Sequence, residues 1–291
     1  MHLIKLLKYL VESSFIYIFF IIIKILKLKK SRSVFSYIFN KVGPLIKSKN
    51  IIKENLNKII PNSSDEQKER ITRNMWSNYG MTFVEYMFLN NFRMQQDHIQ
   101  IKGKDILQNI KDKNKPVIFI SGHFANFELM SMELSKNKLN FAAIYRPLNN
   151  IFLNPFMEYL RKKYICRNQI KKGLLGIRHS INHLKKNHSI ALMVDQRLGE
   201  GKSLPFFNFN ALTTTLPAQL ALRFRIDIVP IYLNRLEDNS FILEVLEPIK
   251  IDELQNNEKN KINITIELNK IIEKFILRDP AQWILSHNRW K

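Results

Sequence analysis

The apolar and polar positions change pattern along the chain, and the first block is an almost continuous apolar stretch. Phe15–Ile23 is apolar throughout. The longer run Leu10–Leu28 is interrupted only by Glu12, Ser13, Ser14, Lys24 and Lys27. A bilayer-spanning helix needs about 20 mostly apolar residues, so this stretch falls slightly short. Lysines flank it on both sides and no small-residue cleavage site follows, which disfavours a cleavable signal peptide.

We therefore interpret residues 1–32 as an N-terminal membrane anchor or interfacial helix, with its basic flank on the cytoplasmic side. The alternative is an apolar helix of the protein core. Residues 33–291 form the remaining domain, in which no internal repeat or low-complexity linker is evident.

A second block begins after Pro61 and has helical periodicity. Ser64 and Gln67 have the spacing of a capping box, which predicts a helix start at this point. Apolar residues recur on one face from there to about Asn91, and we interpret this stripe as core.

Past residue 100, short β-rich apolar runs alternate with helical stretches. The expected strands are Val117–Ser121, Phe141–Tyr145, Ile190–Val194, Ile228–Leu233 and Phe241–Val245. The expected helices are approximately Phe124–Lys136, Pro155–Lys163, Leu174–Lys186, Leu216–Phe224 and Ile262–Leu277. Such alternation predicts an α/β domain with a largely parallel or mixed sheet.

Charge narrows the classes of partner. The chain has 46 Lys and Arg against 25 Asp and Glu, a formal net charge of +21. This excess indicates a polyanionic partner: nucleic acid, an anionic membrane surface or an acidic protein. The alternative is compositional: the chain is rich in Lys, Ile and Asn, and in this interpretation some of its lysines are simply solvated. Cys166 is the single cysteine, which excludes an intrachain disulfide and fits a reducing compartment.

The polar residues that could take part in catalysis or binding follow three of the expected strands. They are His123 and Glu128 after the first, Arg146 after the second, and Asp195, Gln196 and Arg197 after the third. In open α/β sheets the ligand crevice lies at the carboxyl ends of the strands, so we expect these segments to meet at one edge.

His123 and Glu128 are the candidate catalytic pair. An imidazole at the end of a strand is placed to take a proton, and a carboxylate one turn later is placed to orient it. The alternative is a surface histidine that caps the next helix, with Glu128 complementing the helix N-terminus.

Arg146 and Arg197 are candidate phosphate ligands, with surface ion pairing as the alternative. Asp195 either positions Arg197, holds substrate hydroxyls or is an ordinary turn carboxylate. The Phe-rich segment before Thr213-Thr214-Thr215 is expected to be an exposed loop that meets acyl chains or the bilayer. Helix capping accounts for one of the three threonine hydroxyls.

Several chemistries lack their signatures. There is no Gly-x-Ser-x-Gly elbow, Walker loop, His-Glu-x-x-His motif or Gly-x-Gly-x-x-Gly run. His179, His183 and His188 lack a carboxylate or cysteine partner, so a basic face toward anionic headgroups is favoured over a metal site. We predict neither a cofactor nor a metal, and we interpret Cys166 as structural.

Together these motifs resemble the bacterial lipid A late acyltransferase family, the lauroyl/myristoyl acyltransferases of the inner face of the inner membrane. The matching segments are the N-terminal apolar basic run, the Pro61-then-helix region, His-Phe-Ala-Asn-Phe-Glu at 123–128, Tyr-Arg-Pro at 145–147, Asp-Gln-Arg at 195–197, Pro-Phe-Phe at 205–207 with Thr-Thr-Thr-Leu-Pro-Ala at 213–218, and the C-terminal Gln-Trp and His-Asn-Arg-Trp. Ala125, Phe127 and Asn208 depart from the residues usual in the family.

The resemblance implies a glycerolphosphate-acyltransferase-like fold, a mixed central sheet flanked by helices. It implies transfer of an acyl chain from acyl carrier protein, the co-substrate, to a hydroxyl of a lipid A precursor, with His123 as general base and Glu128 as its partner. Arg146, Asp195, Gln196, Arg197, Asn126 and Thr214 form the implied substrate-binding set.

The implied partners are acyl carrier protein, an anionic glycolipid and the membrane, at the cytoplasmic face of the inner membrane. Two alternatives within acyl transfer are another glycolipid or phospholipid acceptor and a glycerol-phosphate-type enzyme. The alternative from another class is a basic nucleic-acid-binding protein. The absence of nucleic-acid-binding signatures and the apolar N-terminus argue against it.

Overall fold

A seven-stranded mixed sheet forms the centre of the computed structural model, which describes residues 3–46 and 49–291. Its strands follow the order β1–β9–β8–β2–β5–β3–β4. Their bounds are β1 Ile99–Lys102, β2 Ile118–Ser121, β3 Phe141–Tyr145, β4 Gln169–Lys171, β5 Ser189–Met193, β8 Ile228–Arg235 and β9 Phe241–Val245. The α/β fold and all five expected strands are confirmed. The two edge strands β1 and β4 escaped detection because they are short and half polar.

The sheet is buried on both faces. Strands β8, β2, β5, β3 and β4 are parallel to one another, while β9 pairs antiparallel with β8 and parallel with β1. Ile118 and Ile120 belong to one apolar cluster and Phe119, between them, to the other. A parallel strand covered on both sides needs such an unbroken apolar run, which is why the pattern was readable in the sequence.

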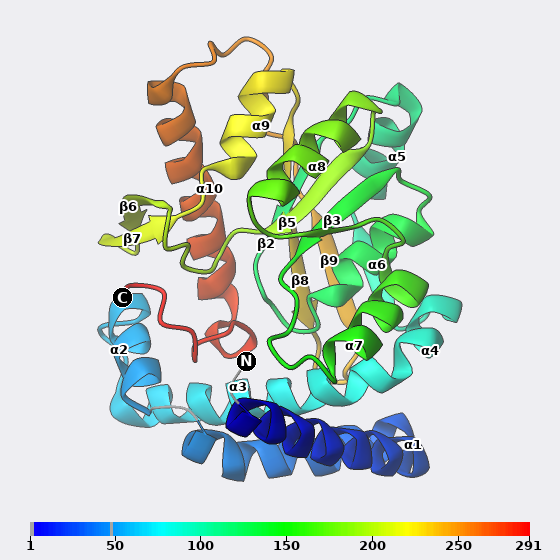
Figure 1. Cartoon of the computed structure of the whole chain (residues 1–291). Helices are drawn as coiled ribbons and strands as arrows, with labels where there is room; N and C mark the ends of the chain where they lie inside the picture. The colour runs from blue at the N-terminus through cyan, green and yellow to red at the C-terminus, as the bar shows by residue number, and fades with distance from the viewer. Residues whose placement is uncertain (1–2, 47–48) are drawn as a thin grey trace.

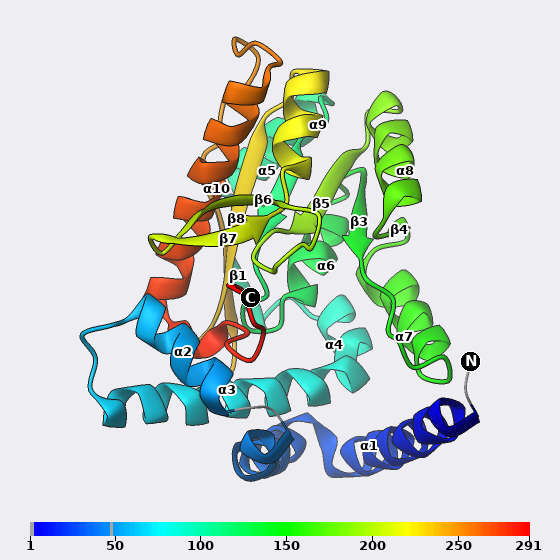
Figure 2. The same cartoon turned by 60° about the vertical axis from the view of Figure 1, so that its left-hand side comes forward.

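Helices cover the two faces (Figures 1 and 2). Side chains of α8, α9 and α10 join the first cluster, and those of α5, α6 and α7 join the second. The bounds are α5 Lys104–Lys113, α6 Glu128–Lys136, α7 Asn154–Leu160, α8 Leu174–Lys185, α9 Leu216–Phe224 and α10 Glu258–Arg278. The expected start of a helix at Phe124 is wrong. α6 begins at Glu128 because Ala125 has a φ of 46°, which no right-handed helix accommodates.

The expected capping box is present. The Gln67 N–H donates to the Ser64 hydroxyl, and the Ser64 N–H donates to the Gln67 side chain, each at 3.2 Å. The helix that begins there, α3, spans Asp65–Glu85 and continues through the short turn η1 (Tyr86–Phe88) into α4 (Leu89–Met94). A further helix, α2 (Lys49–Ile59), precedes it. The C-terminal end of α3 carries Thr82 and Glu85, which contact the loop after β2. Helix α3 therefore lies below the carboxyl ends of the strands (Figure 1).

The N-terminal apolar stretch belongs to α1, which extends from Leu3 to Ile46 with a kink at Lys27. The helix is long and apolar enough to cross a membrane. It lies along α3, and one face contributes Phe20, Ile23 and Phe35 to the core. The opposite face exposes large apolar side chains, among them Leu3, Ile4, Leu7, Phe15, Ile21 and Ile25. This exposed apolar face supports membrane association. The expected boundary after residue 32 falls inside α1.

The expected exposed Phe-rich loop is wrong. Residues 202–213 form an antiparallel hairpin of β6 (Lys202–Phe206) and β7 (Phe209–Thr213). Phe207 and Asn208 form its two-residue turn with φ values of 50° and 61°, the left-handed conformation that such turns require. Phe206 is fully buried against Trp283 and Trp290, and Phe207 is 9% exposed. Phe206 and Phe207 therefore attach the hairpin to the C-terminal segment, whereas Phe209 remains 47% exposed.

Candidate active site

The loop that follows β2 is held from several sides. The Ala125 N–H donates to the Gln282 carbonyl at 2.9 Å, and the Ala125 carbonyl accepts from the Thr82 hydroxyl at 3.2 Å. A Cβ at Gly122 would lie 2.7 Å from the ring of Phe124, so this position has room only for glycine. The sharp turn places the next residue, His123, at the carboxyl edge of the sheet.

His123 is paired with Asp195. Its Nδ1 lies 2.8 Å from Asp195 Oδ1, and its backbone N–H donates to Asp195 Oδ2 at 3.0 Å. The His123 side chain is 20% exposed, whereas that of Asp195 is fully buried. With Nδ1 facing the carboxylate, Nε2 is the nitrogen that remains to meet a ligand. A buried carboxylate on Nδ1 and a free Nε2 are the requirements of a histidine general base.

The environment of Asp195 keeps it ionised. Trp283 Nε1–H donates a third hydrogen bond to it, at 2.8 Å. Burial by itself would raise the pKa of this carboxyl group. Charge interaction with His123 and hydrogen bonds from His123 and Trp283 outweigh burial and lower the pKa to about 2. Asp195 thus presents a fixed negative charge to the imidazole across the neutral pH range.

Glu128 has different partners from those expected. Its Oε1 accepts from the Tyr86 hydroxyl at 2.5 Å and from Arg161 Nε at 2.7 Å. Burial, and then Glu128, raise the pKa of Tyr86, so its hydroxyl remains a donor. The hydrogen bonds that orient His123 come from Asp195, on a different strand end. Glu128 instead fixes the guanidinium of Arg161 at the wall of the same cavity.

A cavity of about 260 Å³ opens beside His123. It contains most of the residues proposed from the sequence: His123, Glu128, Arg146, Gln196, Arg197 and Thr214. Its apolar wall includes Met130, Ile144, Ile165, Leu192 and Met193, and its cations are Arg146, Arg161, Lys172 and Arg197. A chamber that combines an apolar wall with four cations suits a ligand with a hydrocarbon chain and an anionic headgroup.

Asn126 lies outside the lining of this cavity. It is fully buried, and its side-chain amide donates to Glu85 Oε2 at 2.9 Å. Glu85 is also buried and receives Arg32 from α1, at 2.8 Å, and Arg235 from β8. Burial by itself would raise the pKa of Glu85, but the two guanidinium groups outweigh it and lower the pKa. Through Glu85, Asn126 therefore connects the loop that follows β2 to α1 and β8.

Three residues of this region were missed from the sequence. Arg161 and Tyr86 hold Glu128, and Arg289 donates to the Leu212 carbonyl and the Thr213 hydroxyl at 2.9 and 2.7 Å. The Arg289 side chain is fully buried, and burial lowers its pKa to about 10. The C-terminal motif His-Asn-Arg-Trp could have indicated Arg289. No sequence motif indicated Tyr86 or Arg161, because their contacts join segments that are far apart in the sequence.

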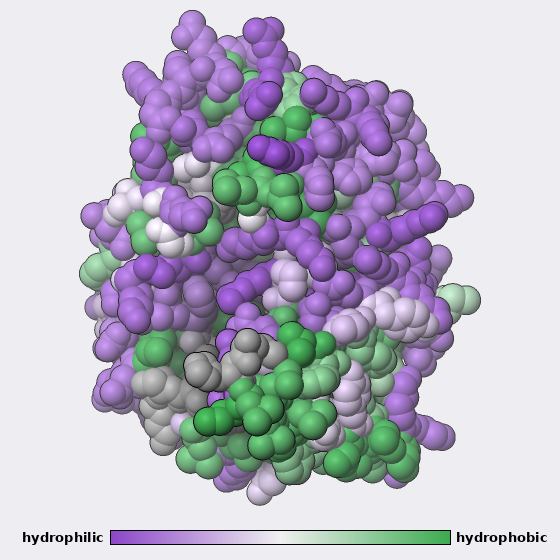
Figure 3. Space-filling model, viewed as in Figure 1, coloured by the Kyte–Doolittle hydropathy of each residue, from purple (hydrophilic) through white to green (hydrophobic). Residues whose placement is uncertain are grey.

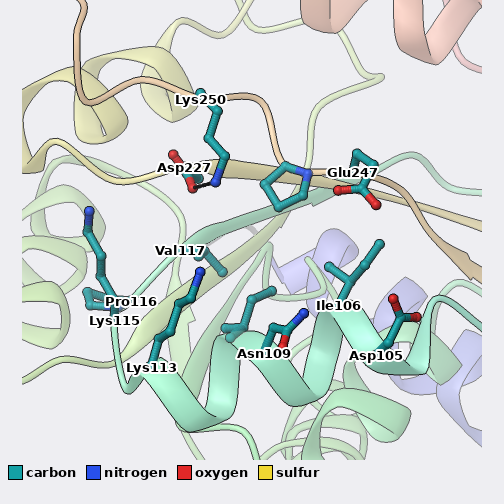
Figure 4. Close-up of a pocket in the computed structure, with 12 residues that line it drawn as sticks. Asp105, Ile106, Asn109, Lys113, Lys115, Pro116, Val117, Asp227, Glu247 and Lys250 are labelled. Carbon is teal, nitrogen blue, oxygen red and sulfur yellow. Dashed lines mark hydrogen bonds and ion pairs between the residues drawn. The ribbon is translucent and has the colours of Figure 1, made fainter.

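A second cavity, of about 170 Å³, lies at the other end of the sheet (Figure 4). Val117 and Asp227 mark the amino ends of β2 and β8, and Asp227 forms an ion pair with Lys250 at 2.9 Å. None of the sequence-proposed site residues lines this cavity. Ligands of α/β sheets bind at the carboxyl ends, so the cavity beside His123 is the candidate active site.

Comparison with known proteins finds relatives that cover most of the chain. The chain is 28% identical over 264 residues to the lipid A biosynthesis palmitoleoyltransferase of Escherichia coli K12, covering 85% of this chain and 80% of that protein. It is 24% identical to the lipid A biosynthesis acyltransferase 2 of Shigella flexneri, covering 79% and 73%. It is 23% identical to the lipid A biosynthesis lauroyltransferase of E. coli K12, covering 83% and 78%.

The sequence profile described as bacterial lipid A biosynthesis acyltransferase matches residues 2–291, which is nearly the whole chain. A match of this extent excludes a chance similarity of isolated motifs. The chain belongs to the bacterial lipid A biosynthesis acyltransferase family.

Proposed function

We propose that this protein transfers a fatty acyl chain from acyl carrier protein to a hydroxyl of a lipid A precursor. Family membership supports acyl transfer in lipid A biosynthesis. The observation that carries the finer assignment is the His123–Asp195 pair at the edge of a cavity with an apolar wall and four cations.

The reaction needs a base but no acyl-enzyme. His123 Nε2 takes the proton of the acceptor hydroxyl as its oxygen attacks the thioester carbonyl carbon. The tetrahedral intermediate collapses with cleavage of the C–S bond, and the imidazolium returns the proton to the departing thiolate. Asp195 keeps the proton of the neutral imidazole on Nδ1 and stabilises the imidazolium. A base of this kind contributes about 10²–10⁴ in rate.

The cations have two tasks in this proposal. Arg146 and Arg197 bind the phosphates or sugar headgroup of the acceptor, or stabilise the oxyanion. Arg161 is held by Glu128 at 2.7 Å and therefore presents a pre-positioned charge to the cavity. This changes the role of Glu128 from the partner of His123 to the support of Arg161.

The proposed place of the reaction is the cytoplasmic face of the bacterial inner membrane. The exposed apolar face of α1 supports contact with the bilayer, where the glycolipid acceptor resides. The donor reaches the same cavity from the aqueous phase. Another glycolipid or phospholipid acceptor in the same membrane is compatible with the same chemistry.

The test is His123→Gln in detergent-purified protein, assayed with acylated carrier protein and a lipid A precursor by mass spectrometry of the product. We expect kcat to fall by about 10²–10⁴ in protein that circular dichroism shows to be folded. His188→Gln, on the turn after α8 and outside the cavity lining, is the matched control. A His123→Gln enzyme with the wild-type rate would end the general-base proposal.

A further inference from the structure

One stretch of the chain is unusually basic and lies beside the active site. Residues 159–178 contain no aspartate or glutamate. In those 20 positions the chain has seven cations: Arg161, Lys162, Lys163, Arg167, Lys171, Lys172 and Arg178. Two of these cations are paired with carboxylates outside the run, Arg161 with Glu128 and Lys171 with Glu158. The other five give the stretch its positive potential.

The fold gathers this stretch on one edge of the sheet. It comprises the short helical turn η2 (Arg161–Ile165), the edge strand β4 and the first turn of α8. Figure 2 shows β4 and α8 along this edge, above the two helices α1 and α3 at the base. Arg161 and Lys172 also line the cavity beside His123, so the basic stretch reaches the wall of that cavity.

An apolar tip lies in the middle of these cations. Leu174 is 80% exposed and Leu175 is 66% exposed, and Ile177 follows on the same turn. Figure 3 shows a hydrophobic patch over the first turn of α8, surrounded by hydrophilic surface. Gly173 has a φ of 128° and allows the sharp turn from β4 into the helix. Two leucines presented this way are a small hydrophobic anchor with a basic rim.

The two substrates of the proposed reaction come from different phases. The exposed apolar face of α1 is assigned to contact with the bilayer, where the acceptor resides. The basic surface of residues 159–178 is therefore available to bind the donor. Acyl carrier proteins are acidic, so their charge complements this surface. We propose that residues 159–178 are the docking surface for the acidic acyl carrier protein, with Leu174 and Leu175 as its apolar contact; this rests on the proposed function.

The arrangement has a direct consequence for catalysis. A carrier protein bound on this surface holds its thioester arm beside the cavity that Arg161 and Lys172 line. Opposite charges outside the contact accelerate encounter, and the buried apolar centre sets the lifetime of the complex. The surface therefore governs KM for the protein-borne donor and leaves the chemical step at His123 unchanged.

The test compares two donors on two variants, Leu174→Ser/Leu175→Ser and Lys162→Glu/Lys163→Glu. One donor is the acylated carrier protein, and the other is the same acyl group on free pantetheine, which has no protein to dock. We expect KM for the carrier protein to rise at least about 10-fold in each variant, with kcat unchanged. Kinetics with the pantetheine thioester should match the wild type. Lys111→Glu/Lys113→Glu on α5, at the far end of the sheet, is the matched charge control.

Three results would overturn the proposed docking surface, and a fourth would overturn the proposed function. Equal losses with both donors would mean that the variants damage the cavity. Unchanged KM for the carrier protein, together with lost binding to phosphatidylglycerol vesicles, would assign the surface to lipid instead. A wild-type enzyme that uses neither donor would refute the proposed function itself, whereas an active wild type with indistinguishable variants would refute only the docking surface.

Discussion

Replacing Asp195 by asparagine separates the two candidate partners of His123. The carboxylate accepts three hydrogen bonds, from His123 Nδ1, the His123 backbone N–H and Trp283 Nε1, at 2.8, 3.0 and 2.8 Å. Asparagine has the same shape but offers one oxygen and one NH₂ group. An NH₂ group at the Oδ2 position would leave two buried donors without an acceptor, at a cost of about 1–3 kcal/mol each. We therefore expect the NH₂ group at the Oδ1 position, where it donates to Nδ1 once His123 has changed tautomer.

The catalytic loss should exceed the loss of stability. Without the carboxylate, nothing favours the Nδ1–H tautomer or stabilises the imidazolium, and we expect kcat to fall by about 10²–10⁴. The assay is acyl transfer at saturating donor, with the free energy of unfolding measured in parallel. Nitrogen-15 NMR of labelled histidine should show that His123 changes tautomer in Asp195→Asn. Asp227→Asn, at the opposite end of the sheet, controls for loss of a carboxylate.

Glu128→Gln gives the contrasting result. Its oxygen still faces Arg161 and Tyr86, but the lost charge loosens Arg161, so we expect a higher acceptor KM with the His123 tautomer retained. If Asp195→Asn kept the wild-type kcat while Glu128→Gln changed the tautomer of His123, then Glu128 would be the orienting residue and the reasoning from the hydrogen bonds would be refuted.

Three further predictions follow from the fold. Replacing Ile21 and Ile25, which are 62% and 74% exposed, by serine should weaken vesicle binding by roughly 10-fold per residue, measured by co-sedimentation. Because the pKa of Asp195 is lowered from 3.8 to about 2, its ionised form stabilises the fold at pH values above 3.8. About 2 kcal/mol of the free energy of unfolding should therefore be lost as the pH falls from 4 to 2, as measured by denaturant titrations of the wild type and Asp195→Asn. Asn208→Val should lower unfolding free energy by about 1–2 kcal/mol because φ is 61°, whereas Asn208→Gly should not.

The elements that could be predicted are those whose burial produces a recognisable pattern of apolar residues along the sequence. Strands such as Ile118–Ser121 are covered on both faces, so they form uninterrupted apolar runs. The capping box at Ser64 was readable for a similar reason, because all its partners lie within four residues. β4 was missed because an edge strand of three residues lacks such a run. The Phe-rich segment was misread because its burial depends on Trp283 and Trp290, more than 70 residues later.

The sequence by itself indicated the family, the apolar and basic N-terminal segment, and the strand ends at which the polar residues lie. Local patterns and short motifs carry that information, since secondary structure depends on neighbouring residues. Only the tertiary structure decided that His123 pairs with Asp195, 72 residues away, and that Glu128 supports Arg161. Spacing along one segment pointed to Glu128, whereas neighbouring parallel strands bring Asp195 within hydrogen-bond distance of His123.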